Sequence, residues 1–195
     1  MSIPSRAEAA AILAGLSPSD KLVNHSAAVG EVAAFIAAAM ARRGVAVDTN
    51  LAEAAALLHD LDKALPAGDR MRALGHGTGG AEWLRAHGHG ELSEAVQSHP
   101  VYVLGGAESY EAWAAVIRLE AQIVAYADKR AIQDLVSLDE RFERWYRRYP
   151  DSAMLPIGHE RARRLERDLC ALAGLAPQEI SRLPWVDEAM RAVAG

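Results

Sequence analysis

Histidine and aspartate residues occur at several points of the chain where the surrounding sequence predicts burial. His25 lies on the apolar face of the segment 19–44, His59 and Asp60 interrupt the apolar run "LLHDLDK", and Asp128 follows "VAYA". A buried carboxylate without a partner is so costly that it shifts its pKa, finds a cation or binds a metal. Imidazole and carboxylate groups suit iron, manganese, zinc and similar divalent ions. The pattern therefore indicates a metal centre that joins separate helices.

Five further histidines are candidates of different strength. His76 lies in the glycine-rich stretch "GHGTGG", and His99 lies at an expected helix end in "SHP". His87 and His89 in "AHGHG" are interpreted as solvent-facing, with substitute metal ligands as the alternative, and His159 is interpreted as a surface residue. His76 and His99 thus extend the candidate metal centre.

Basic side chains close to these acids are candidates for contact with an anion. Lys63 lies one helical turn after His59, so its ammonium could reach a phosphate oxygen as a point charge; a salt bridge to a neighbouring aspartate is the alternative. Lys129 and Arg130 follow Asp128, and adjacent helix positions point in different directions, so at most one of them shares the pocket. Basic side chains around the acidic metal ligands would attract a negatively charged substrate, so the pattern favours an anionic ester over a neutral one.

Composition restricts the remaining classes. The 195 residues suggest one domain, and the many alanines with few phenylalanines favour packed helices over a sheet. The net charge of −5 argues against general nucleic-acid binding, and the single cysteine excludes an internal disulfide framework. We find no signal peptide and no run of about 18 or more apolar residues, so we expect no membrane span and a cytoplasmic protein.

The elements expected to position these residues are all helical. Helices are predicted over 5–16, 19–44, 50–63 (with Asn50 and Glu53 as a capping box), 81–88, 91–99, 110–136, 137–150 (with Ser137 and Glu140 as a second capping box), 158–175 and 184–194. A loop with a short helical piece is expected over 64–80, and a looser connection over 103–109. We find no alternating strand pattern, repeat or low-complexity segment, and we predict a single all-α domain.

The spaced His, His-Asp, Asp pattern resembles the HD-domain superfamily of metal-dependent phosphohydrolases. The matching residues are His25 in "VNHSAAV", the doublet in "LLHDLDK" and Asp128 in "YADKR". The resemblance covers about residues 20–148, leaving 149–195 as a helical extension. It implies a helical bundle in which these four residues bind one divalent metal.

Two motifs between the doublet and Asp128 are similar to those of a branch that binds a second metal. His76 in "HGTGGAEWL" and His99 in "SHP" match its two additional histidines, and Asp60 would bridge both ions. That branch includes bacterial diadenosine-tetraphosphate hydrolases and other nucleotide phosphohydrolases. The chain departs from it at Asp62, where many relatives have Gly or Ala; this carboxylate would orient a ligand or pair with Lys63.

The resemblance implies hydrolysis of a nucleotide or similar small phosphate ester or anhydride by a metal-bound water. Two ions, iron, manganese or another transition metal, with magnesium or zinc as alternatives, would be held by His25, His59, Asp60, His76, His99 and Asp128. Asp60 and Lys63 are the candidate catalytic residues, and Lys63 and Arg130 the candidate phosphate contacts. Alternative functions are a di-iron oxygenase with the same ligands and a non-catalytic metal-binding module; a homodimer is a further expectation.

Several neighbours of these residues have a structural interpretation. His25 could be a core histidine bonded to a carbonyl, and Asp128 could pair with a basic neighbour on a solvated face. The segment "RFERWYRRY" mixes aromatic residues with arginine, which suits nucleobase stacking. Phe142 and Trp145, three residues apart in this segment, are interpreted instead as its buried stripe.

Overall fold

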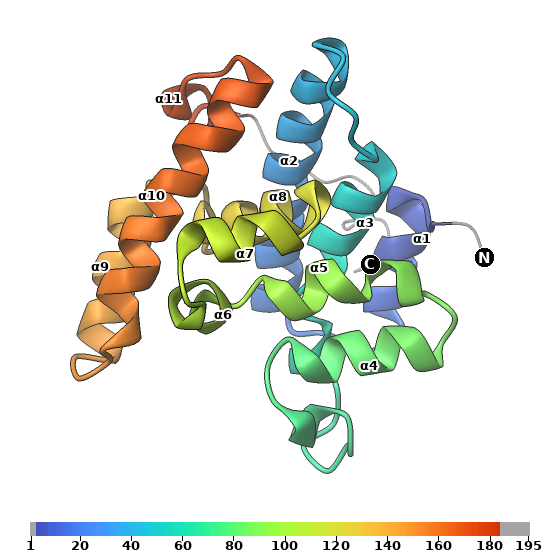
Figure 1. The fold of residues 1–195 in the computed structure, drawn as a ribbon. Coiled ribbons are helices and arrows are strands. Elements are labelled where there is room, and N and C mark those ends of the chain that lie inside the picture. The colour runs from blue at the N-terminus through green and yellow to red at the C-terminus, as the bar shows by residue number, and fades with distance from the viewer. Residues whose placement is uncertain (1–2, 184–195) are drawn as a thin grey trace.

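A computed structural model describes residues 3–183 as a bundle of α-helices and short 3₁₀ helices, without a β-strand in that range (Figure 1). The helices are α1 (Arg6–Ala14), α2 (Asp20–Arg42), α3 (Thr49–Leu58), η1 (Leu61–Lys63), η2 (Arg72–Leu74), α4 (Thr78–Ala86), η3 (Gly90–Leu92), α5 (Ser93–Ser98), α6 (Val101–Gly106), α7 (Tyr110–Val116), α8 (Leu119–Lys129), α9 (Leu138–Arg148), α10 (Met154–Ala173) and α11 (Pro177–Ile180). The predicted all-α class is confirmed.

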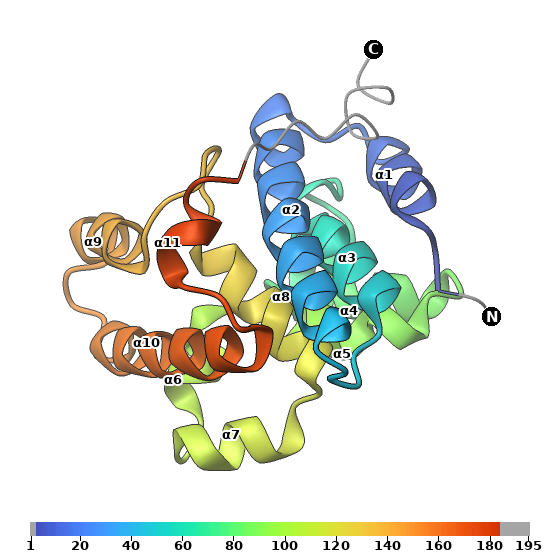
Figure 2. The same ribbon diagram turned by 90° about the horizontal axis from the view of Figure 1, so that it is seen from above.

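Three helices, α2, α3 and α8, form the centre of the bundle and pack against one another. Viewed from above, α9, α10 and α11 lie on one side of α2 and α8, and α1 and α3 lie on the other (Figure 2). Small side chains permit the close approach of α2 and α3. A Cβ atom added at Gly30 would lie only 2.8 Å from Cδ2 of Leu57. The alanine-rich composition therefore serves close helix packing.

One helix, α2, is long and apolar enough to cross a membrane by length and composition, with a mean hydropathy of 1.4 over its most apolar window. The segment is not an unbroken apolar run, because Asn24, His25 and Glu31 interrupt it, so it meets this criterion only by its mean hydropathy. Of that window, 67% is buried inside the bundle, and the helix carries Ser26 and His25 on its buried surface. A helix that is apolar nearly all round is typical of the core of a globular protein.

Helix starts show one correct and one wrong prediction. Ser137 and Glu140 form the expected capping box at α9. At α3, the cap is Asp48, whose carboxylate accepts a hydrogen bond from the Leu51 amide at 2.9 Å. Glu53 instead accepts a hydrogen bond from Arg6 of α1. Local spacing allowed either Asp48 or Asn50 as the N-cap, and the Glu53 carboxylate that a capping box at Asn50 would need contacts Arg6.

The helix predicted over 110–136 is in fact two helices and a loop. The chain extends at Arg118, whose amide donates to Glu94 Oε1 at 2.9 Å. The Gln122 side chain donates to the carbonyls of Ala114 and Ile117, at 3.0 and 2.8 Å. These bonds satisfy the backbone groups that a break in a helix leaves free. The apolar period of the sequence continues across this break and carries no sign of these side-chain bonds, of which the one from Glu94 comes from another helix.

The connection predicted over 103–109 contains most of helix α6, which packs on α10. A Cβ atom at Gly105 would lie 2.8 Å from the Met154 carbonyl oxygen, and one at Gly158 would lie 2.8 Å from Cγ2 of Val101. The two backbones therefore meet at glycines. Arg161 of α10 donates to the carbonyl oxygens at the end of α6, those of Leu104, Gly105, Ala107 and Glu108.

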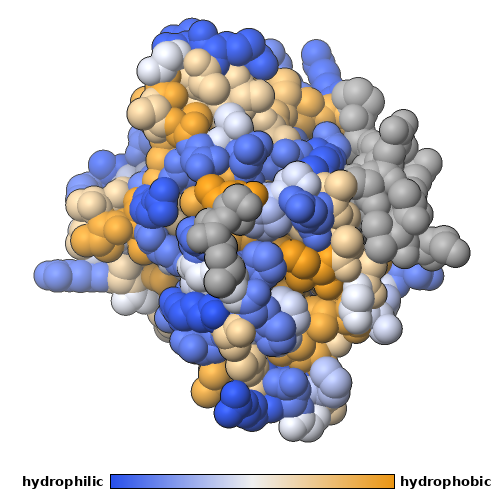
Figure 3. Space-filling view, turned by 90° about the vertical axis from the view of Figure 1, so that its right-hand side faces the viewer, coloured by the Kyte–Doolittle hydropathy of each residue, from blue (hydrophilic) through white to orange (hydrophobic). Residues whose placement is uncertain are grey.

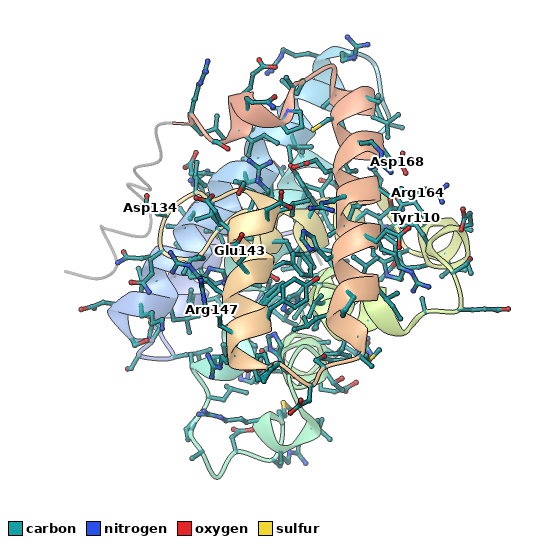
Figure 4. All side chains as sticks on the ribbon, turned by 90° about the vertical axis from the view of Figure 1, so that its left-hand side faces the viewer. Tyr110, Asp134, Glu143, Arg147, Arg164 and Asp168 are labelled. Carbon is teal, nitrogen blue, oxygen red and sulfur yellow. The ribbon has the colours of Figure 1, made fainter. Side chains whose placement is uncertain are left out.

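A second set of contacts joins α7 to α10 (Figure 4). The Tyr110 hydroxyl donates to Asp168 Oδ2 at 2.6 Å, and the Arg164 guanidinium lies 4.6 Å from the centre of the Tyr110 ring. Helix α10 begins at Met154, four residues before its predicted start, with Pro156 in its first turn, where proline is tolerated. The helix predicted over 184–194 lies outside the described residues.

The molecular face that includes α1 carries intermixed hydrophilic and hydrophobic side chains (Figure 3). Large apolar side chains exposed elsewhere, such as Val116 and Leu74, belong to separate short helices. Scattered apolar residues of this kind are normal on protein surfaces.

Candidate metal centre

Helix α3 ends earlier than predicted, and this break positions two of the candidate ligands. The helix stops at Leu58 rather than near residue 63, with His59 as its C-cap, and a 3₁₀ turn begins at Leu61. His59 and Asp60 are both buried, with 0% and 1% exposure. A continuous α-helix would turn successive side chains about 100° apart. The change of geometry instead brings His59 and Asp60 into one cluster.

The first group of ligand atoms comes from α2, the end of α3 and α8. His25 Nε2 and His59 Nε2 lie 3.1 Å apart. Asp128 Oδ1 is 3.3 Å from His25 Nε2 and 3.7 Å from His59 Nε2. Asp60 Oδ2 is 3.5 Å from each of these nitrogens. The four predicted ligands thus surround one point.

A second group lies on the other oxygen of Asp60. His76 Nε2 and His99 Nε2 are 3.1 Å apart, and they lie 3.5 and 3.6 Å from Asp60 Oδ1. His76 lies close to His99 because the loop that carries it packs against Pro100, the residue after His99. Gly77 has a positive φ of 78°, and a Cβ there would lie 2.8 Å from Pro100 Cγ. All six predicted metal ligands are therefore brought together.

The hydrogen bonds of the imidazoles fix which nitrogens face the cluster. The Nδ1 atoms of His25, His59 and His99 lie 2.6–2.7 Å from the backbone carbonyl oxygens of Ile132, Ala56 and Val96. Because a carbonyl can only accept, each Nδ1 carries the proton and donates. The Nε2 atoms therefore face the cluster, and each carries a lone pair when its ring is neutral. Fixing the tautomer through Nδ1 is the usual support of a histidine metal ligand.

Asp62 provides the same support to His76. Its Oδ2 lies 3.1 Å from His76 Nδ1, and its side chain is buried. Two roles were predicted for this extra carboxylate, and the contact with His76 fits the first of them, which is to orient a candidate metal ligand. Lys63 pairs with Asp60 instead, with its Nζ donating to Oδ2 at 2.6 Å and half of its side chain exposed.

Burial and nearby charges compete in setting the charges of the cluster. Burial lowers the pKa of His59, but Asp60 and Asp128 outweigh it and raise that pKa to about 9. Burial disfavours the Asp60 carboxylate, yet His59, His99 and Lys63 hold its pKa well below the ordinary value. Burial lowers the pKa of His99 to about 4. The carboxylates of Asp60 and Asp128 therefore stabilise a positive charge beside them. When no metal cation is bound, the proton on His59 provides that charge.

Two observations show that the cluster fits divalent ions. Asp60 Oδ1 is buried and has no hydrogen-bond partner among the described residues. The facing pairs of imidazole nitrogens at 3.1 Å also need either a shared proton or a cation, because two neutral lone pairs repel. Groups of three ligand atoms lie within 4.8 Å of one another, as in His25, His59 and Asp128 or in His59, Asp60 and His99. Nitrogen and carboxylate donors suit iron, manganese or zinc.

The two basic residues after Asp128 have structural contacts. Lys129 is fully buried, and its Nζ donates to the carbonyls of His99 and Ala125 at 2.7 Å. Its ammonium lies 3.6 Å from Asp128 Oδ2, so it supports two ligands from behind.

Arg130 is buried at the start of the loop after α8. All of its donors are used, by Val136 O, the Tyr126 hydroxyl, Glu166 Oε1, Pro177 O and Ser181 Oγ. The predicted contact of Arg130 with a substrate phosphate therefore has no support in the structure, because no N–H remains for it.

The other histidines lie outside this cluster. His87 is exposed and stacks on Trp83, with ring centres 3.7 Å apart. His89 is half-buried and takes part in none of the ligand groups. The interpretation of His159 as a surface residue is wrong: its side chain is 12% exposed, stacks on Phe142 and contacts Asp139 at 2.9 Å.

One residue near the centre was missed by the sequence analysis. Arg141 of α9 has its Nη2 3.3 Å from Asp128 Oδ1. The available signal was its position on the helix, since residues 138, 141, 142 and 145 share one face. An arginine among the buried stripe of Leu138, Phe142 and Trp145 needs an acidic partner inside the protein.

The fold and this cluster define an all-α protein with a candidate His/Asp metal centre. The family model described as the HD domain matches residues 22–132, which is more than half of the chain, and the chain belongs to the HD-domain family. Proteins of this family are generally metal-dependent hydrolases, commonly phosphohydrolases. The matched segment contains all six ligands and ends before α9. No curated protein and no solved structure matches the chain.

Proposed function

We propose that this protein is a phosphohydrolase that holds two divalent ions and acts on a nucleotide or another small phosphate ester or anhydride. The observation that carries the proposal is the Asp60 carboxylate. Its Oδ2 faces the His25 and His59 nitrogens, and its Oδ1 faces those of His76 and His99. A carboxylate with each oxygen directed at its own pair of imidazoles is the arrangement expected of a bridging ligand.

Divalent ions at such a centre would lower the pKa of a coordinated water and neutralise charge on phosphoryl oxygens. The protein itself fixes the ligand positions, through the carbonyl partners of three histidines and through Asp62 behind His76. His99 stays neutral because its pKa is near 4, so its Nε2 lone pair remains available at neutral pH. Lys63 is half-exposed beside Asp60, and we assign it to a phosphoryl oxygen of the substrate.

The similarity of "HGTGGAEWL" and "SHP" to motifs of the two-metal branch supports nucleotides, including dinucleoside polyphosphates, as the substrates to test first. We also propose that the protein acts in the cytoplasm.

The test is elemental analysis of protein purified without chelator, followed by a phosphate-release screen over nucleotides, dinucleotides and sugar phosphates. We expect about two ions per chain and release of phosphate with Mn²⁺ under anaerobic conditions. Activity that requires both iron and O₂ would favour the oxygenase alternative. Tight metal binding without any turnover would favour a non-catalytic module.

A further inference from the structure

Helix α9 lies outside the segment that matches the HD domain, yet it contributes a cation to the metal centre. Leu138, Arg141, Phe142 and Trp145 form its inward face, and three of these four are apolar. Arg141 is 15% exposed, and its guanidinium carbon lies 4.4 Å from the centre of the Trp145 ring. The stacked indole holds the guanidinium in place beside the cluster.

The atom that Arg141 touches is the metal-directed oxygen of Asp128. Arg141 Nη2 is 3.3 Å from Asp128 Oδ1, and this same oxygen lies 3.3 Å from His25 Nε2 and 3.7 Å from His59 Nε2. The other oxygen, Oδ2, faces Lys129 at 3.6 Å. Arg141 is therefore at the edge of the proposed ion position rather than behind the ligand.

The guanidinium edge that contacts Asp128 is only partly used. Nε and Nη2 form one edge of the arginine fork; Nη2 makes the long contact with Asp128, and Nε is buried without a hydrogen-bond partner among the described residues. Leaving a buried charged donor unpaired is costly. A phosphoryl group offers two oxygens that fit such an edge, since arginine binds phosphate in a bidentate way.

Two cations therefore flank the centre from segments far apart in the sequence. Lys63 contacts Asp60 Oδ2, and Arg141 contacts Asp128 Oδ1, and both oxygens lie within 3.7 Å of the His59 Nε2 atom. Lys63 is already paired at 2.6 Å, whereas the Arg141 contact is long and leaves donors free. Arg141 is thus the better placed of the two for a forked contact with an anion.

We propose that Arg141 binds the phosphoryl group of the substrate at the metal centre, an inference that rests on the proposed phosphohydrolase function. The test measures the affinity of inorganic phosphate for the Mn²⁺-loaded protein by calorimetry, with manganese content determined on the same samples. Arg141→Gln keeps polar atoms near Trp145 but removes the charge and the fork. The matched control is Arg147→Gln, at an exposed position of the same helix (Figure 4).

We expect Arg141→Gln to bind phosphate about 10- to 100-fold more weakly, the range for a lost charged hydrogen bond, with unchanged manganese content. Arg147→Gln should match the wild type. Unchanged phosphate affinity in Arg141→Gln would overturn the inference. Loss of manganese in that variant would overturn it too, because Arg141 would then act by holding Asp128.

If Arg141→Gln does not fold, Arg141→Lys preserves the charge while removing the fork. We expect phosphate binding to weaken several-fold at constant manganese content, and an unchanged affinity would refute the forked contact. Failure of the proposed function is a separate result: the wild-type protein, fully loaded with Mn²⁺, would then neither bind phosphate nor release it from any substrate.

Discussion

Two buried polar clusters lie next to each other at the end of α8, and they are built on opposite principles. Asp128 and Arg130 are two residues apart, and both are at most 6% exposed. Around Arg130, each N–H has an acceptor, and Glu166 accepts hydrogen bonds from both Tyr126 and Arg130. Around Asp128 and Asp60, imidazole nitrogens face one another, and Asp60 Oδ1 has no hydrogen-bond partner within residues 3–183.

This difference separates a structural cluster from a candidate metal centre. A buried polar network is stable when every member is satisfied, and unsatisfied groups raise the free energy of the folded state. The Arg130 cluster is closed and needs no ligand. The metal centre is open, and a cation would supply what its groups lack. Both clusters are buried and charged, so what distinguishes them is whether their hydrogen-bond donors and acceptors have partners.

The largest effect is expected from Asp60→Asn, which tests whether the open cluster is a metal centre. An amide has nearly the shape of the carboxylate but lacks its charge and its second oxygen, so it cannot bridge two ions. We expect both ions and all hydrolytic activity to be lost while the helical circular dichroism spectrum is retained. Elemental analysis and phosphate release check this. Wild-type metal content in the variant would contradict the bridging role.

The closed cluster should respond in the opposite way. Arg130→Met removes the ion-pair partner of Glu166 and the donor to the carbonyls of Val136 and Pro177, so we expect unfolding to require about 3–5 kcal/mol less free energy. The metal content of the folded fraction should stay at the wild-type level. Urea denaturation and elemental analysis measure the two quantities. Loss of metal in correctly folded Arg130→Met would show that the clusters are not separable.

Acid should affect the metal-free open cluster more than the closed one. His99 has a pKa of about 4 in the folded state against 6.5 as its ordinary value, so the unfolded chain binds the proton first. Stability should therefore fall by about 3 kcal/mol as the pH drops from about 6.5 to about 4. His59, with its raised pKa, is protonated in both states below pH 6.5 and does not oppose this loss. Denaturation of metal-free protein across this range checks the prediction, and His99→Gln should reduce the slope.

The smallest effect is expected from Asp62→Ala, which tests the support of one ligand. Without the acceptor for its Nδ1, His76 is free to rotate and to change tautomer. Loss of such an outer partner typically lowers metal affinity about 10- to 100-fold. We expect the weaker of the two binding steps to shift in a metal titration while the other stays constant. Equal losses at both steps would point to a general distortion.

The fold class and the residues that meet in the candidate centre could be predicted from the sequence for simple reasons. Residues such as His25 and Asp128 occur in strongly apolar helical surroundings, where only a partner or a metal makes them tolerable. The alanine-rich composition and the period of the apolar residues likewise pointed to packed helices. Both signals are local, and local signals are what a single sequence displays.

The features that could not be predicted depend on contacts between distant segments. The break at Arg118 relies on Glu94 and Gln122, and α6 contains two glycines because α10 approaches its backbone. Arg130 was grouped with Asp128 because the two are close in sequence, but the helix ends between them and their side chains enter different clusters. Arg141 was overlooked because the sequence shows that it neighbours Phe142 on α9 but not that α9 brings it to Asp128 of α8.

The glycine contact between α6 and α10 has a practical consequence for dissecting the protein. A boundary drawn at residue 132, where the family match stops, would strip α10 from the four carbonyl groups that Arg161 covers at the end of α6. Removing α10 would also expose the backbone of α6 at Gly105, where no side chain covers it. Any shortened version intended for crystallisation or engineering should therefore retain α10 and the chain through Ser181, whose Oγ accepts a hydrogen bond from Arg130, even though sequence similarity alone suggests a much smaller unit.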